Sequence, residues 1–322
     1  MSTNNSNELH IIFGTGPVGL AVMEELLAKG KRVRMINRSG RNANIPASVD
    51  VVSGDAKNLD FARKAAEGAT HIYNALNPSY DKWLDLFPGL QAGTVAAAEA
   101  TGAKLIVMEN LYMYGHTHGK PMTENTPFNP HTRKGKLRAE MHETLMAAHN
   151  AGKIRVVMGR ASDFVGSRAL DTALGDRVIY PALEGKAASI VGKADLLHTY
   201  SYIPDVGTAL VTLGEHDSAL GQAWHIPNAP TITTKAYIEK IFAEAGHPAK
   251  ISAAPKPILW LLGRFNPIIK EVYEMVYEFE EPFIVDHSKY VKAFGDHSTQ
   301  VDTVVKETVK WYRENPKSAN GH

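Results

Sequence analysis

The sequence predicts an α/β fold with a doubly wound parallel sheet, followed by a smaller, mostly helical lobe. Six apolar runs of strand length recur through the first half of the chain, at 9–13, 32–36, 50–53, 70–74, 104–108 and 155–159. Segments with the apolar spacing of helices separate them, at 17–30, 58–68, 83–100 and 133–151. Nearly continuous apolar strands that alternate with helices are typical of parallel sheets, whose ligands bind beyond the carboxyl ends of the strands.

The second half of the chain lacks this alternation. Residues 161–200 are rich in glycine, alanine and turn signals. A short helix at 203–213 and a strand at 222–227 are expected to add to the sheet, and apolar spacing predicts two later helices at 233–246 and 266–279.

These patterns predict two domains. The first comprises 1–165 and is completed by 198–226, and the second comprises 166–197 and 227–322. The apolar segment PILWLLG (257–263) is too short to span a bilayer, so we expect it to form a buried helix or a pocket wall.

Composition and charge exclude several classes of partner. Lys and Arg total 35 against 34 for Asp and Glu, so the net charge of +1 provides no chain-wide field for nucleic acid or an anionic membrane. The absence of cysteine excludes disulfides, thiolate nucleophiles and cysteine-bound zinc. The polar start MSTNNSNEL has no features of a signal peptide. We therefore expect a cytoplasmic protein with a small-molecule partner.

The strongest motif is the glycine-rich turn Gly14-Thr-Gly16-Pro17-Val18-Gly19, directly after the first apolar run. The first glycine permits a tight turn, the second lets backbone amides approach a pyrophosphate, and the third lets the following helix pack against the strand. This context predicts a Rossmann-type, dinucleotide-binding domain. The alternative is a glycine turn without a ligand.

The end of the second strand suggests which dinucleotide binds. It reads Asn37-Arg38-Ser39, with no Asp or Glu for a ribose 2′-hydroxyl, and an arginine beside hydrogen-bonding groups favours a 2′-phosphate. NADP(H) is therefore the preferred cofactor, with NAD(H) as the second choice. The alternative is that Arg38 belongs to an ordinary solvated loop.

Two further loops follow strands on the ligand side. Asp55, next to Ala56, is expected either to accept a hydrogen bond from an adenine amino group or to cap the next helix. The run Ala75-Leu76-Asn77 is small enough for the backbone to pass close to a cofactor ribose, or it is only a turn before Pro78.

Several short motifs resemble those of the extended short-chain dehydrogenase/reductases, in the NAD-dependent epimerase/dehydratase family. The stretches are GTGPVG, the SGD after the third strand, NLYMYG (110–115), KGKLRAE (134–140), GRASDFVG (159–166) and HTYSYIPDVGTAL (198–210). Their order and spacing cover nearly the whole chain. The resemblance implies a Rossmann-type domain and a second lobe that binds the substrate.

The resemblance also implies a catalytic set, which this chain keeps only in part. In the family, a Ser or Thr orients the substrate oxygen, and a Tyr in Tyr-x-x-x-Lys transfers the proton while the Lys holds the nicotinamide ribose. Alignment on Lys136 places Thr132 at the tyrosine position and Asn110 at the serine position. A threonine hydroxyl is far less acidic than a phenol, so another group must transfer the proton.

Candidate donors lie in loops on the ligand side. Tyr112 is the first, His131 the second, and Tyr200 with Tyr202 the third. Tyr112 could instead fill space beneath its loop, and Lys136 could be a solvated helix lysine. Asp163 and Phe164 fall where relatives contact the substrate or carboxamide, although Asp163 could only cap a turn.

Three functions are compatible with these residues. The first is an NADP(H)-dependent oxidoreductase acting on a carbonyl, alcohol or enone of a small molecule. The second is a sugar-nucleotide epimerase or dehydratase, and the third is an NADP(H)-binding sensor or scaffold without turnover. His116 and His118 lack a third ligand at suitable spacing, so no metal is expected. The long helices after the fourth and fifth strands, with small residues at 95–100, would allow a homodimer.

Overall fold

The computed structural model describes residues 8–40, 43–254 and 256–317, which form two compact units. The first contains 1–113, 133–161 and 206–226, and the second contains 114–132, 162–205 and 227–322. Each unit is described by itself below.

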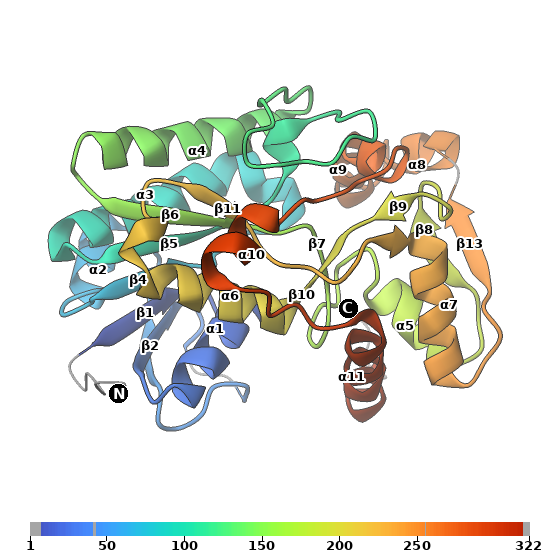
Figure 1. The fold of residues 1–322 in the computed structure, drawn as a ribbon, viewed down its shortest axis with the longest axis horizontal. Coiled ribbons are helices and arrows are strands. Elements are labelled where there is room, and N and C mark those ends of the chain that lie inside the picture. The colour runs from blue at the N-terminus through green and yellow to red at the C-terminus, as the bar shows by residue number, and fades with distance from the viewer. Residues whose placement is uncertain (1–7, 41–42, 255, 318–322) are drawn as a thin grey trace. The chain divides into compact units, whose positions relative to one another are not determined.

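The first unit is built on a seven-stranded parallel sheet (Figure 1). Its strand order is β11-β6-β5-β4-β1-β2-β3. The strands are β1 (Leu9–Phe13), β2 (Arg32–Asn37), β3 (Asp50–Ser53), β4 (His71–Asn74), β5 (Lys104–Glu109), β6 (Arg155–Arg160) and β11 (Ala223–His225). All six predicted strands are confirmed, and the apolar segment at 222–227 supplies the seventh. The predicted Rossmann-type α/β fold is therefore correct.

Helices cover both faces of this sheet (Figure 1). One face carries α2 (Leu59–Ala65), α3 (Trp83–Thr101) and α4 (Arg133–Asn150), and the other carries α1 (Pro17–Ala28) and most of α6 (Ile203–Glu215). The 3₁₀ turns are η1 (Tyr80–Lys82), η2 (Tyr112–Tyr114) and η3 (Asp217–Ala219). Two consecutive alanines of α3, Ala97 and Ala98, pack into the core with residues of β4 and β5. Of the small residues expected to allow a homodimer, Ala96, Ala97 and Ala98 are buried, and Ala100 is exposed.

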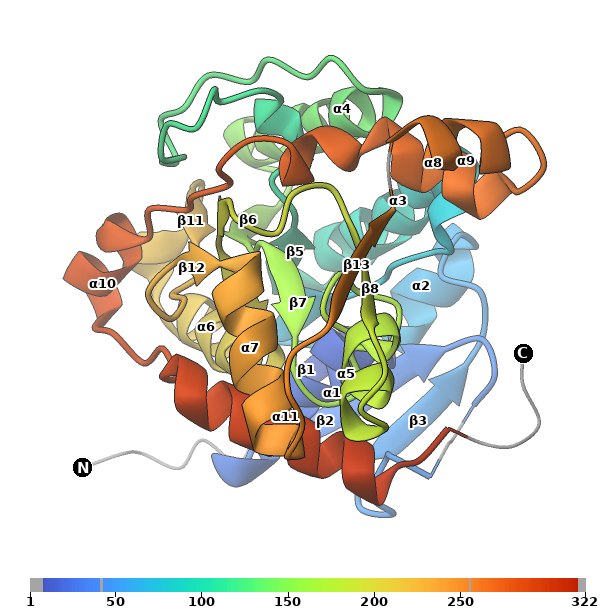
Figure 2. The same cartoon turned by 90° about the vertical axis from the view of Figure 1, so that its right-hand side faces the viewer.

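The second unit combines helices with three short two-stranded sheets. The sheets pair β7 (Asp163–Val165) with β10 (Tyr200–Tyr202), β9 (Leu197–His198) with β12 (Ile232–Thr233), and β8 (Ala188–Val191) with β13 (Ile251–Ala254). Helices α5 (Asp176–Leu183), α7 (Thr234–Ala245) and α11 (Val301–Glu314) pack around one apolar core (Figure 2). The remaining elements are α8 (Lys256–Leu262), α9 (Pro267–Glu274), η4 (Val276–Phe279) and α10 (Ser288–Phe294).

One expectation for this unit was wrong. The segment 257–263 does form helix α8, but it is not buried: Trp260 is 51% exposed and Leu261 52% exposed, whereas only Leu259 packs inward. Among the residues that the structure describes, no helix is both long enough and apolar enough to cross a membrane.

Candidate active site

The glycine-rich turn has the geometry that a diphosphate requires. Gly14 has φ of +110°, a conformation that favours glycine, and a Cβ there would lie 2.6 Å from the carbonyl oxygen of Ala75. A Cβ on Gly19 would collide with the carbonyl oxygen of Gly14, so the helix and the turn are in close contact. The space over Gly16 is open, and no side chain caps the first turn of α1. The amides at this positive helix end are therefore available to an anion.

The sheet register brings the predicted cofactor loops together. Phe13 at the end of β1 pairs with Ile36 of β2 and with Asn74 of β4, so the residues that follow these strands surround the glycine turn. The Asn37 side chain donates to Thr15 Oγ1 at 3.0 Å and to the Gly40 carbonyl at 2.8 Å. This amide holds the glycine turn against the loop that carries Arg38 and Ser39, both of which are exposed.

Asp55 and Ala56 have roles within the fold. The Asp55 carboxylate accepts from the backbone amide of Lys57 at 2.9 Å, while Asn58 provides the N-cap of α2. The suggestion that Asp55 caps this helix was therefore wrong. Ala56 is buried where α3 passes close to its carbonyl. Ala75 donates its amide to the Phe13 carbonyl, Leu76 donates to Asn74 Oδ1, and Asn77 is exposed.

Tyr112, the first candidate proton donor, lies in an aromatic cluster of the first unit. The Tyr80 hydroxyl donates to the Tyr112 hydroxyl at 3.2 Å, and the Trp83 ring stacks on Tyr112 with centroids 5.7 Å apart. The Nζ atom of Lys134, a side chain only 1% exposed, lies 4.5 Å from the centroid of the Tyr80 ring. A second phenol thus adjoins Tyr112, and a buried ammonium group lies over the ring of that second phenol. Neither Tyr80 nor Lys134 was predicted from the sequence as a site residue.

The three residues at the family's catalytic positions differ in environment. Lys136 is exposed on α4, two residues past the buried Lys134. Asn110 accepts a hydrogen bond from the Tyr112 amide at 3.3 Å, so part of its side chain stabilises the turn after β5. Thr132 is buried in the second unit.

A buried cluster of charges joins the ends of β5 and β6. The Glu109 carboxylate contacts Arg160 Nε at 2.9 Å and His142 Nδ1 at 3.2 Å, and both Glu109 and Arg160 are almost completely buried. Arg138 donates to the Met108 carbonyl at 3.3 Å. Burial would raise the pKa of Glu109, but the Arg160 guanidinium and the His142 hydrogen bond lower it to about 2. The carboxylate is therefore ionised and ties the end of β5, which precedes Asn110 and Tyr112, to the end of β6.

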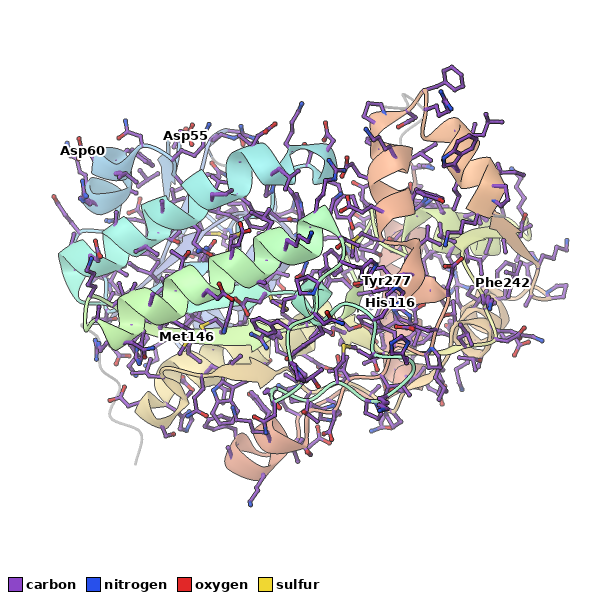
Figure 3. The ribbon with its side chains drawn as sticks, turned by 90° about the horizontal axis from the view of Figure 1, so that it is seen from above. Asp55, Asp60, His116, Met146, Phe242 and Tyr277 are labelled. Atoms are coloured by element: carbon purple, nitrogen blue, oxygen red, sulfur yellow. The ribbon has the colours of Figure 1, made fainter. Side chains whose placement is uncertain are left out.

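The second unit holds the remaining predicted residues in two groups. His131 stacks on His116 with ring centroids 4.2 Å apart and meets the edge of Tyr277, and Figure 3 shows His116 beside Tyr277. Burial and the neighbouring His116 lower the pKa of His131. His118 stacks on His116 with ring centroids 5.9 Å apart. The described part of the chain contains no group of three acidic or imidazole side chains arranged to hold a metal ion.

Asp163 forms the second group. Its carboxylate lies 2.7 Å from Nε2 of the buried His198, whose ring stacks on Phe279. Phe164 is half-buried on the same strand. Near this pair, Glu278 is buried with one carboxylate oxygen that has no hydrogen-bond partner, and burial together with Asp163 raises its pKa well above the ordinary value. Glu278 was not predicted from the sequence as a site residue.

The third-choice donors are poorly suited to proton transfer. Tyr200 is 5% exposed, its hydroxyl hydrogen-bonds Thr234 at 2.9 Å, and burial raises its pKa above the ordinary value. Burial and Asp205 raise the pKa of Tyr202 to about 12. Both phenols are therefore harder to ionise than an ordinary tyrosine, whereas a proton carrier at neutral pH needs a lowered pKa.

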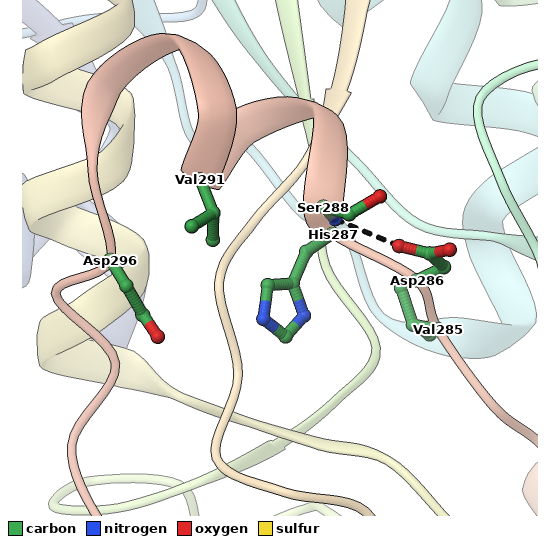
Figure 4. Close-up of a pocket in the computed structure, with 6 residues that line it drawn as sticks. All are labelled: Val285, Asp286, His287, Ser288, Val291 and Asp296. Atoms are coloured by element: carbon green, nitrogen blue, oxygen red, sulfur yellow. Dashed lines mark hydrogen bonds between the residues drawn. The ribbon is translucent and has the colours of Figure 1, made fainter.

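A pocket elsewhere in the second unit contains none of the predicted site residues (Figure 4). Its lining comprises Val285, Asp286, His287, Ser288, Val291 and Asp296. Asp286 accepts from the Ser288 amide at 2.8 Å, so this polar lining is engaged in the local turn.

The parallel sheet and its glycine turn define a dinucleotide-binding α/β protein. A family model agrees: residues 11–226 match the NAD dependent epimerase/dehydratase family, and the chain belongs to this family. The match runs from β1 to β11, which means that it includes every strand of the large sheet.

Individual relatives are more distant. The chain is similar to the dTDP-6-deoxy-L-talose 4-dehydrogenase (NAD(P)(+)) of Kitasatospora kifunensis, with 25% identity over 263 residues, 77% of this chain and 82% of that protein. Two solved structures share the fold. The first is dTDP-glucose 4,6-dehydratase of Bacillus anthracis in complex with NAD, with a TM-score of 0.79 and 16% identity over 96% of this chain and 97% of that one. The second is UDP-glucose 4-epimerase of Thermotoga maritima with UDP-glucose, with a TM-score of 0.75 and 14% identity over 95% of this chain and 99% of that one.

Proposed function

We propose that this protein is a nicotinamide-dependent enzyme that oxidises or reduces a secondary alcohol or ketone of a sugar nucleotide. The main support is the family match across the whole sheet, combined with a glycine turn whose amides are open to a diphosphate. The similar protein of Kitasatospora kifunensis is a 4-dehydrogenase of a dTDP-sugar, which combines oxidoreduction with a sugar-nucleotide substrate. We therefore favour a sugar nucleotide as the substrate over an unspecified small carbonyl compound.

The preferred cofactor in this proposal is NADP(H), with NAD(H) as an accepted alternative. Arg38 and Ser39 are exposed at the end of β2, beside the turn that would hold the diphosphate. A guanidinium group there can pair with a 2′-phosphate, whereas the carboxylate that usually accepts from a 2′-hydroxyl is missing. Lys136, exposed at the start of α4, is the proposed contact to the nicotinamide ribose.

Tyr112 is the proposed proton carrier. The bound nicotinamide would accept or supply the hydride at the substrate carbon. In the oxidation direction, the Tyr112 phenolate takes the hydroxyl proton of the substrate while the carbon–hydrogen bond breaks. The hydrogen bond from Tyr80 would stabilise the phenolate form of Tyr112, and the ammonium group of Lys134 over the Tyr80 ring would make Tyr80 a stronger donor in that bond. This pair would do for Tyr112 what the conserved lysine does for the family's usual tyrosine.

One specific observation favours a second candidate, a protein that binds the cofactor without turnover. The family's tyrosine position is the buried Thr132, and Asn110 at the serine position has a hydrogen bond to the backbone. A protein that lacks both groups and has no substitute for them would bind the cofactor but would not catalyse hydride transfer.

A substrate panel separates the two candidates. The absorbance of NADPH and NADH is followed with dTDP- and UDP-hexoses, their 4-keto derivatives and simple ketones and enones. We expect turnover with a nucleotide sugar, a loss of about 10²- to 10⁴-fold in kcat/KM for Tyr112→Phe, and unchanged cofactor affinity. Tyr180→Phe in the second unit is the control.

The outcomes differ clearly between the candidates. Cofactor binding without turnover across the panel would support the non-catalytic candidate. Full activity of Tyr112→Phe would exclude Tyr112 as the proton carrier, and activity confined to simple ketones would exclude the sugar-nucleotide substrate.

A further inference from the structure

The second unit exposes a concentrated apolar surface, which we call the apolar hairpin and define as residues 256–270. It consists of α8, a turn at 263–266 and the start of α9, which lie side by side (Figure 2). Ten large hydrophobic side chains are exposed in the described part of the chain, and six of them lie here: Ile258, Trp260, Leu261, Leu262, Phe265 and Ile268. Single exposed apolar residues are ordinary, but such a concentration indicates an interaction surface.

The hairpin holds these side chains in a defined arrangement. Leu259 is buried and anchors α8 to its unit. The Asn266 side chain caps α9, accepting from the amides of Ile268 and Ile269 at 2.9 and 3.2 Å, and Pro267 starts the helix. The turn therefore projects Phe265, which is 83% exposed, at its tip.

The charge of the hairpin is one-sided. Its exposed charged side chains are Lys256, Arg264 and Lys270, whereas Glu271 and Glu274, in the part of α9 beyond the hairpin, are half-buried. The Arg264 guanidinium lies 5.4 Å from the Trp260 ring centroid, so a cation is placed beside an apolar ring. Lys256 lies at the base of the hairpin, where it contacts Glu280 at 2.8 Å. Aromatic and aliphatic side chains next to lysine and arginine are the combination that binds the interface of an anionic bilayer.

We propose that the apolar hairpin docks on the surface of a membrane that contains anionic phospholipids. Phe265, Trp260 and their aliphatic neighbours would enter the boundary between headgroups and acyl chains, and Arg264 and Lys270 would contact lipid phosphates. Helices of 7 and 8 residues are about 11–12 Å long, far short of the ~30 Å hydrocarbon core, so the hairpin lies on the bilayer and does not span it.

Charge complementarity favours this occupant over a second copy of the chain. In a symmetric pair, the exposed Arg264 and Lys270 of two hairpins would face one another, while the acids of α9 are half-buried and Lys256 is paired with Glu280. An anionic lipid surface matches both the apolar and the cationic side chains. The net charge of the whole chain predicted no membrane partner, because a sum over all residues does not show the exposed cations of this one segment.

Vesicle flotation of the full chain tests the proposal. Vesicles of phosphatidylcholine with phosphatidylglycerol are compared with vesicles of phosphatidylcholine alone, at low and high salt. We expect the protein to float with the anionic vesicles, less so at high salt, and at least tenfold more weakly after Phe265→Ser. Leu59→Ser, at a residue 39% exposed on α2, is the matched control and should bind like the wild type.

A charge variant and a mass measurement complete the test. Arg264→Gln combined with Lys270→Gln should weaken binding to anionic vesicles while leaving cofactor affinity and circular dichroism unchanged. Absence of flotation, or equal flotation of Phe265→Ser and wild type, would overturn the proposal. A wild-type dimer that Phe265→Ser converts to a monomer, as measured by light scattering, would assign the surface to a second copy instead. These readouts do not depend on the proposed enzymatic function.

Discussion

Replacement of Glu109 by glutamine should destabilise the first unit, because it leaves the buried Arg160 without its counter-charge. The two side chains are each 1% exposed and 2.9 Å apart. Lowering the carboxyl pKa from its model-compound value of 4.5 to about 2 corresponds to roughly 3 kcal/mol at neutral pH. Loss of one partner of a buried ion pair typically costs about 3–5 kcal/mol. We therefore expect Glu109→Gln to lower the free energy of unfolding by on the order of 3 kcal/mol.

The pH dependence provides a sharper test of the same idea. Because the folded-state pKa is depressed, the carboxylate stabilises the fold above its unfolded pKa, and this contribution disappears as the pH falls from about 4.5 through 2. The difference between wild type and variant should therefore shrink from about 3 kcal/mol at pH 7 to roughly 1–2 kcal/mol at pH 3.

Urea unfolding at several pH values measures this difference from the shift in midpoint at constant slope. Glu143→Gln, at an exposed residue of α4, is the control and should change stability by less than about 0.5 kcal/mol. A loss below about 1 kcal/mol for Glu109→Gln, or a difference that does not change with pH, would refute the reasoning.

Two further predictions concern the cofactor and the second unit. Arg38→Ala should weaken NADPH binding by about 10- to 100-fold and NADH binding much less, because only NADPH has a 2′-phosphate for the guanidinium to pair with. Equal losses of affinity for the two cofactors in titration calorimetry would show that Arg38 does not bind the 2′-phosphate. Glu278→Gln should stabilise the protein at pH 8, because burial raises the pKa of this carboxyl in the fold and so makes its ionisation costlier there than in the unfolded chain. That gain should vanish as the pH falls toward about 4, and thermal unfolding that shows no gain at pH 8 would contradict it.

The large sheet was predictable because its signal is local. Each strand from β1 to β6 is a short apolar run bounded by turn residues, and the glycine turn has chemistry that can be recognised within six positions. The short strands of the second unit, such as β8 and β13, are four residues long and carry no such pattern. Their pairing joins residues 63 positions apart in the chain, which composition alone does not encode.

The candidate site was predictable only where one segment provides the chemistry. The contact between Glu109 and Arg160 joins residues 51 positions apart, and it follows from the adjacency of β5 and β6, not from either strand alone. The Tyr80 hydroxyl reaches Tyr112 in the same way, across 32 positions. The exposure of helix α8 could not be predicted, because an apolar run of seven residues has the same sequence pattern whether it faces a core or solvent.

Titration calorimetry with NADP⁺, NADPH, NAD⁺ and NADH on the intact chain tests the central claim most directly. The open amides around Gly16 and the exposed Arg38 predict one dinucleotide per chain, with NADPH bound more tightly than NADH. No heat of binding with any of the four, confirmed by an absence of thermal stabilisation at millimolar cofactor, would contradict it.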